Sequence, residues 1–249
     1  MQSGWVKDTN NWYYLNSSGI MKTGWIKDGG FWHHLSSSGA ADTGWARLAW
    51  NGTMSWYLFD DEGRMRTGWQ KDGGKWYLLA ESGRMLKGWQ KDEGSWYHMA
   101  FDGGAMETGW IKSGGSWYLL GESGRMRTGW QKVDGSWYHL DDYGRMDTGW
   151  LKLHGTWYLL SSGGRMLTGW QLTEDDNRWY YMRSSGHMVT GWLLDAGKWY
   201  YLDDEGAMKT GWTKVGDTWY HLNSSGAMST GWVKDGGSWF YLSSSGAMV

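Results

Sequence analysis

A Gly-Trp pair recurs along the whole chain at intervals close to 20 residues. Its tryptophan stands at positions 5, 25, 45, 69, 89, 110, 130, 150, 170, 192, 212 and 232, and a second tryptophan follows in each interval. These two series account for all but one of the 25 tryptophans, and Trp50 is the one left over. A period this short means that each unit is one supersecondary element that must stack on its neighbours. We therefore predict a single repeat domain of twelve units over residues 1–249.

Residues 129–148 illustrate what one unit contains. Two short aromatic-rich runs flank Asp134-Gly135, and such a pair is a strong hairpin signal because both residues tolerate positive φ. The second run leads into a polar stretch that ends in Gly144, which predicts a second turn with glycine in the left-handed region. No segment sustains a 3.6-residue hydrophobic period. The predicted fold class is all-β, a solenoid of about twelve 20-residue β-hairpins in which Trp, Tyr and Met supply the buried area.

Two units are longer than the others, and both additions lie between the two predicted strands. Residues 47–52 lengthen the third unit, and extra residues between Trp170 and Trp179 lengthen the ninth. A solenoid tolerates insertion at a hairpin tip because each repeat contacts only its neighbours. The sequence therefore predicts two extended tips within an otherwise regular array.

Composition argues against several classes of protein. The formal net charge of −2 provides no electrostatic reason to bind nucleic acid. No window approaches the roughly 18 consecutive apolar residues of a membrane span, so no membrane insertion is expected. The chain has no cysteine, which excludes a disulfide scaffold, a thiolate nucleophile and a zinc–thiolate site. Its first residues show no charged segment before an apolar run, so no signal peptide is expected there.

Groups that could suggest an enzyme occupy repeat slots of mixed composition. Acidic pairs at 60–61, 141–142 and 203–204 share a turn slot with serine pairs, which favours solvated turns over paired catalytic carboxylates. One strand slot alternates between histidine and Tyr or Leu, which favours a partly exposed position over a metal ligand; its histidines are His34, His98, His139 and His221. We therefore predict no catalytic residues, no metal and no cofactor.

Strand alternation predicts where the aromatic side chains meet. Trp137 and Tyr138 must point to opposite faces, so the tryptophan face of one hairpin can meet the first tyrosine of the next. Trp130, Trp137 and Tyr158, with Met146 beside them, would then form a box of π faces that suits a quaternary ammonium ion. Stacked aromatics could equally form a core and nothing more. Repeated use of Trp, and the exposure expected between short hairpins, favour a ligand.

Lysine recurs two residues after the first tryptophan, on the same face of the strand. We expect these side chains to extend along the aromatic edge, with their ammonium groups in solvent; they are Lys7, Lys27, Lys71, Lys91, Lys112, Lys132, Lys152, Lys214 and Lys234.

The pattern Gly-Trp-x-Lys-x-x-Gly-x-Trp-Tyr-x-Leu-x-x-x-Gly-x-Met-x-Thr resembles the choline-binding repeat of Gram-positive surface proteins, autolysins and phage endolysins, over the whole chain. The resemblance implies a left-handed superhelix of β-hairpins. It also implies a secreted, cell-wall-associated module that binds choline or phosphocholine of teichoic or lipoteichoic acids between consecutive hairpins. Similar glucan-binding repeats of glucosyltransferases and clostridial toxins are the alternative. Those repeats commonly lack a tryptophan before Tyr-Tyr, whereas every unit here has one.

Carried over by position, each choline site takes two tryptophans of one unit, the methionine after them and the aromatic residue of the next unit. The sites are Trp45, Trp56, Met65 and Tyr77; Trp69, Trp76, Met85 and Tyr97; Trp89, Trp96, Met106 and Tyr118; Trp110, Trp117, Met126 and Tyr138; Trp130, Trp137, Met146 and Tyr158; Trp150, Trp157, Met166 and Tyr180; Trp170, Trp179, Met188 and Tyr200; Trp192, Trp199, Met208 and Tyr220; and Trp212, Trp219, Met228 and Phe240.

The ends of the chain and the two insertions depart from the pattern. His33 replaces the tyrosine that would complete Trp5 and Trp12, and Ala41 replaces the methionine expected near Trp25 and Trp32. The insertions are expected to disturb Trp45 and Trp170. Trp232 and Trp239 precede no further hairpin in this sequence, so this end is predicted to be a cap or a contact surface for a second copy in a homodimer.

Overall fold

The computed structural model describes residues 2–249, and this part of the chain contains β-strands and turns but no helix. Each strand pairs antiparallel with its neighbour in the chain, which produces twelve two-stranded sheets within the described residues. The predicted all-β array of twelve hairpins is thus confirmed. Because residues 2–249 contain no helix, none is long and apolar enough to cross a membrane.

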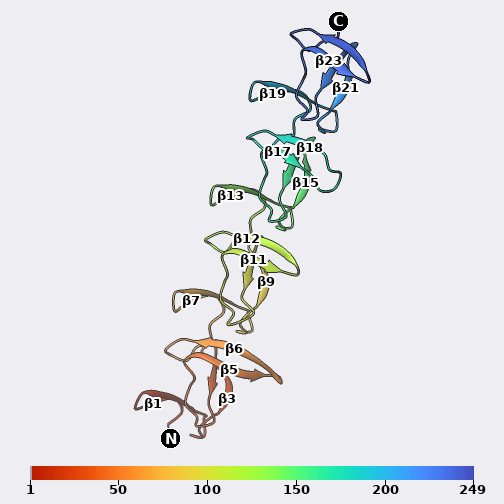
Figure 1. The fold of residues 1–249 in the computed structure, drawn as a ribbon. Helices are drawn as coiled ribbons and strands as arrows, with labels where there is room; N and C mark the ends of the chain where they lie inside the picture. Colours follow the sequence, from red (N-terminus) through yellow and green to blue (C-terminus); the bar gives the residue numbers. More distant parts are fainter. Residues whose placement is uncertain (1) are drawn as a thin grey trace. The chain divides into compact units, whose positions relative to one another are not determined.

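The chain divides into two compact units, Met1–Arg127 and Thr128–Val249. In each unit the hairpins follow one another in chain order (Figure 1). The first unit holds β1 (Gly4–Asp8), β2 (Asn11–Leu15), β3 (Gly24–Asp28), β4 (Phe31–Leu35), β5 (Gly44–Trp50), β6 (Thr53–Phe59), β7 (Gly68–Asp72), β8 (Lys75–Leu79), β9 (Gly88–Asp92), β10 (Ser95–Met99), β11 (Gly109–Ser113) and β12 (Ser116–Leu120).

The second unit repeats the same arrangement. It holds β13 (Gly129–Val133), β14 (Ser136–Leu140), β15 (Gly149–Leu153), β16 (Thr156–Leu160), β17 (Gly169–Leu172), β18 (Trp179–Met182), β19 (Gly191–Asp195), β20 (Lys198–Leu202), β21 (Gly211–Val215), β22 (Thr218–Leu222), β23 (Gly231–Asp235) and β24 (Ser238–Leu242). That residues 1–249 form a single domain stays a prediction.

The hairpin tips have the turn chemistry that the sequence predicts. Between β13 and β14, Asp134 and Gly135 have φ values of 48° and 79°. Positive φ at both central residues is the signature of a type I′ turn, whose twist matches that of the flanking strands. The first insertion extends β5 and β6 to seven residues each and places Asn51 and Gly52 in the same positive-φ turn. The predicted longer tip is confirmed there.

A return segment follows the second strand of each hairpin and closes its core. After β14 the chain turns at Gly144, whose φ is 80°, and Met146 then forms an isolated antiparallel bridge with Leu140. Leucine at the end of the second strand is between 0 and 2% exposed in eight hairpins, at Leu35, Leu79, Leu120, Leu140, Leu160, Leu202, Leu222 and Leu242. The deepest core is therefore built from these leucines rather than from the tryptophans, because the return segment covers the strand end.

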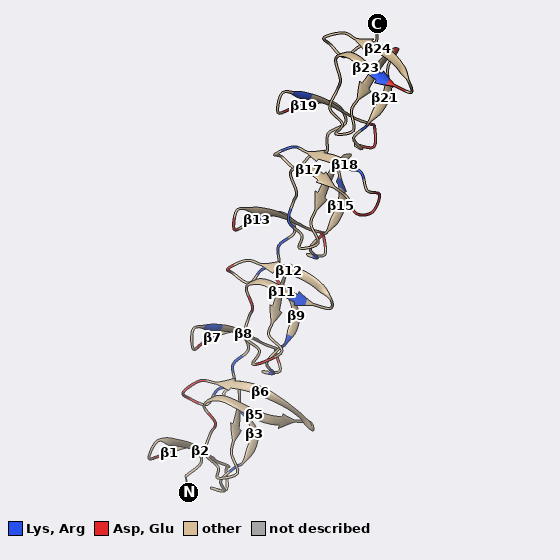
Figure 2. Ribbon diagram, viewed as in Figure 1, with Lys and Arg blue, Asp and Glu red and all other residues tan. Residues whose placement is uncertain are grey.

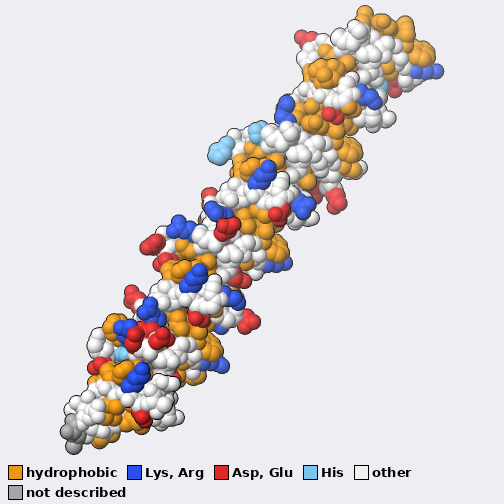
Figure 3. All heavy atoms as spheres, turned by 90° about the vertical axis from the view of Figure 1, so that its left-hand side faces the viewer, with side chains coloured by type: hydrophobic (Ala, Val, Ile, Leu, Met, Phe, Trp, Pro, Cys, Tyr) orange, Lys and Arg blue, Asp and Glu red, His pale blue; other side chains and the backbone are white. Residues whose placement is uncertain are grey.

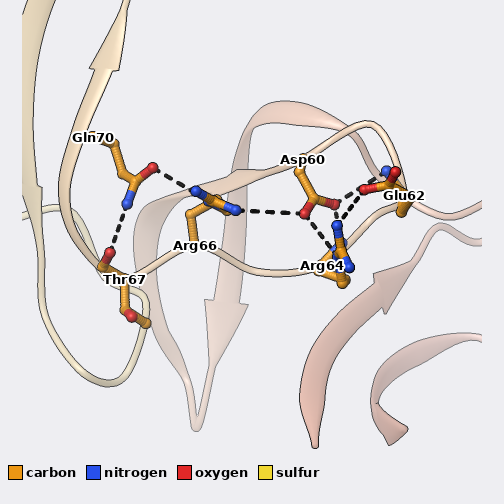
Figure 4. A network of polar contacts seen from close by, with 6 residues as sticks. All are labelled: Asp60, Glu62, Arg64, Arg66, Thr67 and Gln70. Carbon is orange, nitrogen blue, oxygen red and sulfur yellow. Dashed lines mark hydrogen bonds and ion pairs between the residues drawn. The ribbon is translucent and has the colours of Figure 1, made fainter. Parts of the chain in front are cut away.

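The acidic pairs belong to this second turn, as predicted. One oxygen of Asp60 accepts hydrogen bonds from the backbone amides of Glu62 and Arg64, and the other accepts one from Arg64 Nε at 2.8 Å (Figure 4). Partial burial acts to raise the pKa of Asp60, but these hydrogen bonds and the guanidinium hold it below its usual value. Arg66 and Gln70 continue the network toward β7. Figure 2 shows acidic and basic residues spread along both units rather than gathered in one segment.

Candidate ligand-binding site

The register of each hairpin places its two tryptophans on one face. In the seventh hairpin Trp130 pairs with His139, and Lys132 pairs with Trp137. Cross-strand partners share a face, and so do residues two apart along a strand, so these four side chains lie together. Tyr138, one residue on, lies on the opposite face. A hairpin of this kind therefore has a tryptophan face and an opposite face, which holds tyrosine in most hairpins, His33 in the second and Phe240 in the twelfth, as the alternation predicts.

The tryptophan face of one hairpin meets the tyrosine face of the next. The rings of Trp130 and Tyr158 lie 5.0 Å apart, tilted by 55°. Beside them is an open cavity of about 360 Å³, lined by Trp130, Trp137, Tyr158, Met166, Ser184 and Ser185. A matching cavity of about 410 Å³ in the first unit is lined by Trp69, Trp76, Tyr97, Met106, Glu122 and Ser123. Each cavity thus draws on three consecutive hairpins, and the third contributes its polar turn.

The same aromatic pairing recurs at the other predicted sites within each unit. The ring centroids lie 4.7 to 4.9 Å apart in the pairs Trp45–Tyr77, Trp69–Tyr97, Trp89–Tyr118, Trp150–Tyr180, Trp170–Tyr200, Trp192–Tyr220 and Trp212–Phe240. The two insertions leave Trp45 and Trp170 in place, contrary to expectation, because the added residues lie at the hairpin tips. The site predicted from Trp110, Trp117 and Tyr138 combines residues of the two units and stays a prediction.

The methionine in each cavity comes from one repeat later than predicted. The spacing predicted Met146 beside Trp130 and Trp137, whereas the structure places Met166 there. The return segment explains the difference, because it crosses back to the preceding hairpin and the Met166 amide donates to the Trp137 carbonyl. The same bond joins Met65 to Trp32, Met85 to Trp56, Met106 to Trp76, Met126 to Trp96, Met188 to Trp157, Met208 to Trp179, Met228 to Trp199 and Met248 to Trp219.

This shift changes the composition of the first two interfaces. Ala41 donates its amide to the Trp12 carbonyl, so it belongs to the first interface. The prediction from spacing, which placed Ala41 at the second interface, was wrong. The first interface therefore lacks both standard partners: His33 packs on Trp5 at 4.6 Å in place of a tyrosine, and Ala41 replaces the methionine. A cavity of about 370 Å³ lies there, lined in addition by Asp28, Gly29, Phe31, Glu62 and Arg64.

The second interface has the two tryptophans, the tyrosine and the methionine of a regular cavity, but another side chain of the protein fills the space between them. It contains Trp25, Trp32, Tyr57 and Met65, and the unassigned Trp50 packs its ring 4.4 Å from Trp25 and 4.7 Å from Trp32. The Trp25 indole N–H donates to the Ala49 carbonyl in the same tip at 3.0 Å. The tip of the third hairpin therefore folds back and occupies the space between the indoles, where the regular interfaces have a cavity.

Sequence reasoning missed a polar partner that orients the first tryptophan. The Trp69 indole N–H donates to Asp92 at 2.9 Å, from the tip of the next hairpin. The same bond links Trp5 to Asp28, Trp45 to Asp72, Trp170 to Asp195 and Trp212 to Asp235. The recurring aspartate just before the hairpin turn was the available signal. Its carboxylate also places negative charge beside the indole that lines the cavity.

The histidine slot contacts the other edge of that tryptophan. His139 packs against Trp130 at 5.0 Å and its Nδ1 lies 2.6 Å from an Asp147 oxygen in the return segment. His34 and Asp42, His98 and Glu107, and His221 and Ser229 form equivalent pairs. His98 is buried rather than partly exposed, because Phe101 of the following turn also covers it. The histidine in this slot therefore packs against the first tryptophan and helps to fix its orientation.

Eight of the nine predicted lysines lie along the second tryptophan, and the ninth, Lys214, lies 4.0 Å from Asp217. Eight ammonium groups stand 5.3 to 6.0 Å from the ring centroid of the tryptophan across the strand, at Lys7, Lys27, Lys71, Lys91, Lys112, Lys132, Lys152 and Lys234. These contacts are cation–π interactions at the rim of the interfaces.

The second tryptophan stays accessible to solvent in most hairpins. The residue is between 37 and 42% exposed at Trp56, Trp76, Trp96, Trp117, Trp137, Trp157, Trp179, Trp199 and Trp219. Figure 3 shows hydrophobic side chains reaching the surface repeatedly, with basic side chains beside several of the patches. Leucines already form the core, so these indoles are not needed to fill it. Repeated exposed apolar surface is typical of a binding surface.

Known proteins match the chain over its full length. The family described as "Choline-binding repeat" matches residues 43–87, 66–108, 107–146, 127–166, 167–211 and 209–249. A second family, "Putative cell wall binding repeat", matches residues 3–21 and 23–41. This chain belongs to the choline-binding repeat family. The predicted family membership is confirmed, and the chain is a choline-binding cell-wall module.

Solved structures of family members share the fold. CbpJ from Streptococcus pneumoniae TIGR4 is 32% identical with a TM-score of 0.78, over 98% of this chain and 99% of that one. Choline-binding protein F from Streptococcus pneumoniae is 31% identical with a TM-score of 0.74, over all of both chains. The choline-binding domain of CbpL from the same organism is 31% identical with a TM-score of 0.55, over 74% of this chain and 97% of that domain. No curated protein matches the chain.

Proposed function

We propose that the cavities between consecutive hairpins hold the trimethylammonium group of choline, and that the chain thereby anchors itself to choline-bearing teichoic or lipoteichoic acid. The observation that carries the proposal is the exposed second tryptophan. The Trp137 indole is exposed to solvent and is not a core residue, whereas Leu140 of the same strand is fully buried in the core. Together with Trp130 and Tyr158 it lines a cavity in which a permanent cation would contact aromatic rings on several sides.

Magnitudes favour a polymer as the target. Each cation–π contact contributes about 0.5–2 kcal/mol, so three rings provide a few kcal/mol and a dissociation constant near the millimolar range. Several such cavities on one chain raise the overall affinity for a polymer by about 10² to 10⁴ through effective concentration. A repeated weak site is therefore suited to a surface polymer that carries many choline groups.

The module acts by binding and not by catalysis, at the outside of the cell. The described residues all belong to hairpins, tips and return segments, and within them Asp60 is bound to Arg64 and His139 to Asp147. The family name and the pneumococcal structures that the chain resembles support a secreted, cell-wall-associated protein.

Choline titration tests the proposal. Choline should raise the free energy of unfolding, since it binds only the folded state, and should elute the chain from a tertiary-amine resin. The matched ligand control is 3,3-dimethyl-1-butanol, which has the same shape without the charge. Equal stabilisation by both compounds would contradict cation–π recognition, and retention on dextran with no choline response would favour glucan binding.

A site variant isolates one cavity. Trp137→Ala should remove one choline equivalent at little cost in stability because the indole is half-exposed. Leu140→Ala is the control: it should lower stability without removing a choline equivalent. Loss of the same number of sites in both variants would contradict the assignment.

We extend the proposal to association of two copies through the twelfth hairpin. Trp232 and Trp239 are 67 and 62% exposed, more than their counterparts in other hairpins. A second copy could cover them by supplying an aromatic face like that of Phe240, which packs on Trp212. Sedimentation velocity should then show a dimer that Trp232→Ser with Trp239→Ser disrupts, and a wild-type monomer at high concentration would contradict this.

A further inference from the structure

The cavity of the ninth hairpin differs from the regular one in size and chemistry. It has a volume of about 590 Å³, against about 360 Å³ for the cavity at Trp137. Both contain two tryptophans, a tyrosine, a methionine and two turn serines. The larger cavity is lined in addition by Asn177, Arg178 and Thr210. An aromatic box is therefore continuous here with a polar, basic extension.

The insertion in this hairpin builds the extension. The loop between β17 and β18 is fixed by Asp176, which accepts hydrogen bonds from the Thr173 hydroxyl at 2.5 Å and the Tyr180 hydroxyl at 2.7 Å. Burial and the bond to Asp176 raise the pKa of Tyr180 to about 12. The backbone amide of Arg178 also donates to Asp176. The Asp176 carboxylate is thus engaged within the loop, and the loop holds Arg178 at the cavity.

The Arg178 guanidinium keeps donors available for a ligand. Its nearest carboxylates, Asp176 and Glu205, lie 3.9 and 3.7 Å away, beyond hydrogen-bond distance. In contrast, Arg64 is bound to Asp60 at 2.8 Å. Glu205 is strongly exposed, so solvent screens its charge. A half-exposed guanidinium with free N–H groups is suited to bidentate binding of a phosphate oxyanion.

We propose that this cavity binds a quaternary ammonium ion together with its phosphate ester. The trimethylammonium group lies between Trp170, Trp179 and Tyr200, and the phosphate accepts hydrogen bonds from Arg178 and the adjacent Asn177. This inference rests on the proposed function for the ammonium half and adds the phosphate half. The regular cavity at Trp137 has no counterpart of Asn177 or Arg178 among its lining residues and holds the ammonium group alone.

Site-resolved titration of the full chain labelled with 5-fluorotryptophan tests this. The fluorine resonances of Trp179 and Trp137 are assigned with Trp179→Phe and Trp137→Phe, and choline, phosphocholine and glycerophosphocholine are the probes. At Trp179 a phosphate ester should bind about fivefold more tightly than choline, the scale of a partly exposed charge-assisted contact. At Trp137 the ratio should be close to one, which serves as the internal control.

Arg178→Gln should lower the ratio at Trp179 to that at Trp137. Tighter binding of either ester at Trp179 supports the inference, and the better ester identifies a monoester or a diester as the target. Equal affinity for choline and both esters at Trp179, or a ratio that Arg178→Gln does not alter, would overturn it. No choline response at either tryptophan would instead refute the proposed function.

Discussion

Removing the Trp50 side chain should convert a packed interface into a ligand site. Its ring lies between Trp25 and Trp32, and the opened space would be walled by these indoles with Tyr57 and Met65, the residue set of a regular cavity. Burying a Trp side chain contributes about 3–5 kcal/mol over alanine, and the partial exposure of Trp50 puts the loss for Trp50→Ala near 3 kcal/mol.

Choline should restore most of that loss. A ligand at 100 times its dissociation constant stabilises the folded state by about 2.7 kcal/mol per site, and only the variant has this additional site. The deficit relative to wild type should therefore fall from about 3 to about 0.3 kcal/mol in saturating choline. The regular cavities are common to both proteins and cancel from the difference.

Urea denaturation of wild type and Trp50→Ala, with and without choline, measures this difference, and calorimetric titration should count one further choline equivalent. Met54→Ala is the matched control, since this tip residue is 53% exposed and outside the packed cluster. A deficit that is the same in the presence and absence of choline, with unchanged stoichiometry, would refute the view that Trp50 occupies a ligand position.

Three further variants test individual contacts. Gly186→Ala should cost about 1–3 kcal/mol in urea denaturation, since its φ is 83° and a Cβ there would lie 2.3 Å from the Met166 sulfur; wild-type stability would contradict this packing. Burial lowers the pKa of His33, so the unfolded chain takes up the proton first and stability should fall as pH drops below about 6.5; His33→Tyr should reduce that fall, and an unchanged pH profile would count against it. Asp92→Ala removes the acceptor of the Trp69 indole and should cost about 1 kcal/mol and weaken choline binding at that cavity, which a fluorotryptophan titration would detect.

Features that depend on neighbouring residues were predictable. Alternation along a strand places Trp137 and Tyr138 on opposite faces wherever the hairpin lies, so the contact between Trp130 and Tyr158 follows from the pattern. The Asp134-Gly135 turn and the addition at the third tip are equally local, because each is set by a short run of residues with particular φ preferences.

Features that depend on the path of the return segment were not predictable. The cavity at Trp137 takes Met166 rather than Met146 because the segment after β16 crosses back to bond with the preceding hairpin. The same crossing moves Ala41 to the first interface. Spacing alone cannot distinguish the two alternatives, since in a regular repeat a methionine occurs at the same offset from every pair of tryptophans.

The amino-acid sequence by itself therefore determined the repeat, the hairpins, their turns and the kind of side chain at each interface. The tertiary structure decided which hairpin supplies each wall and which interfaces are open, including the one that Trp50 fills. The physical reason is the range of the interactions. Backbone conformation and the alternation of faces are fixed within a few residues. A cavity, in contrast, is the space between three consecutive hairpins, and its lining depends on how each hairpin packs on the preceding one.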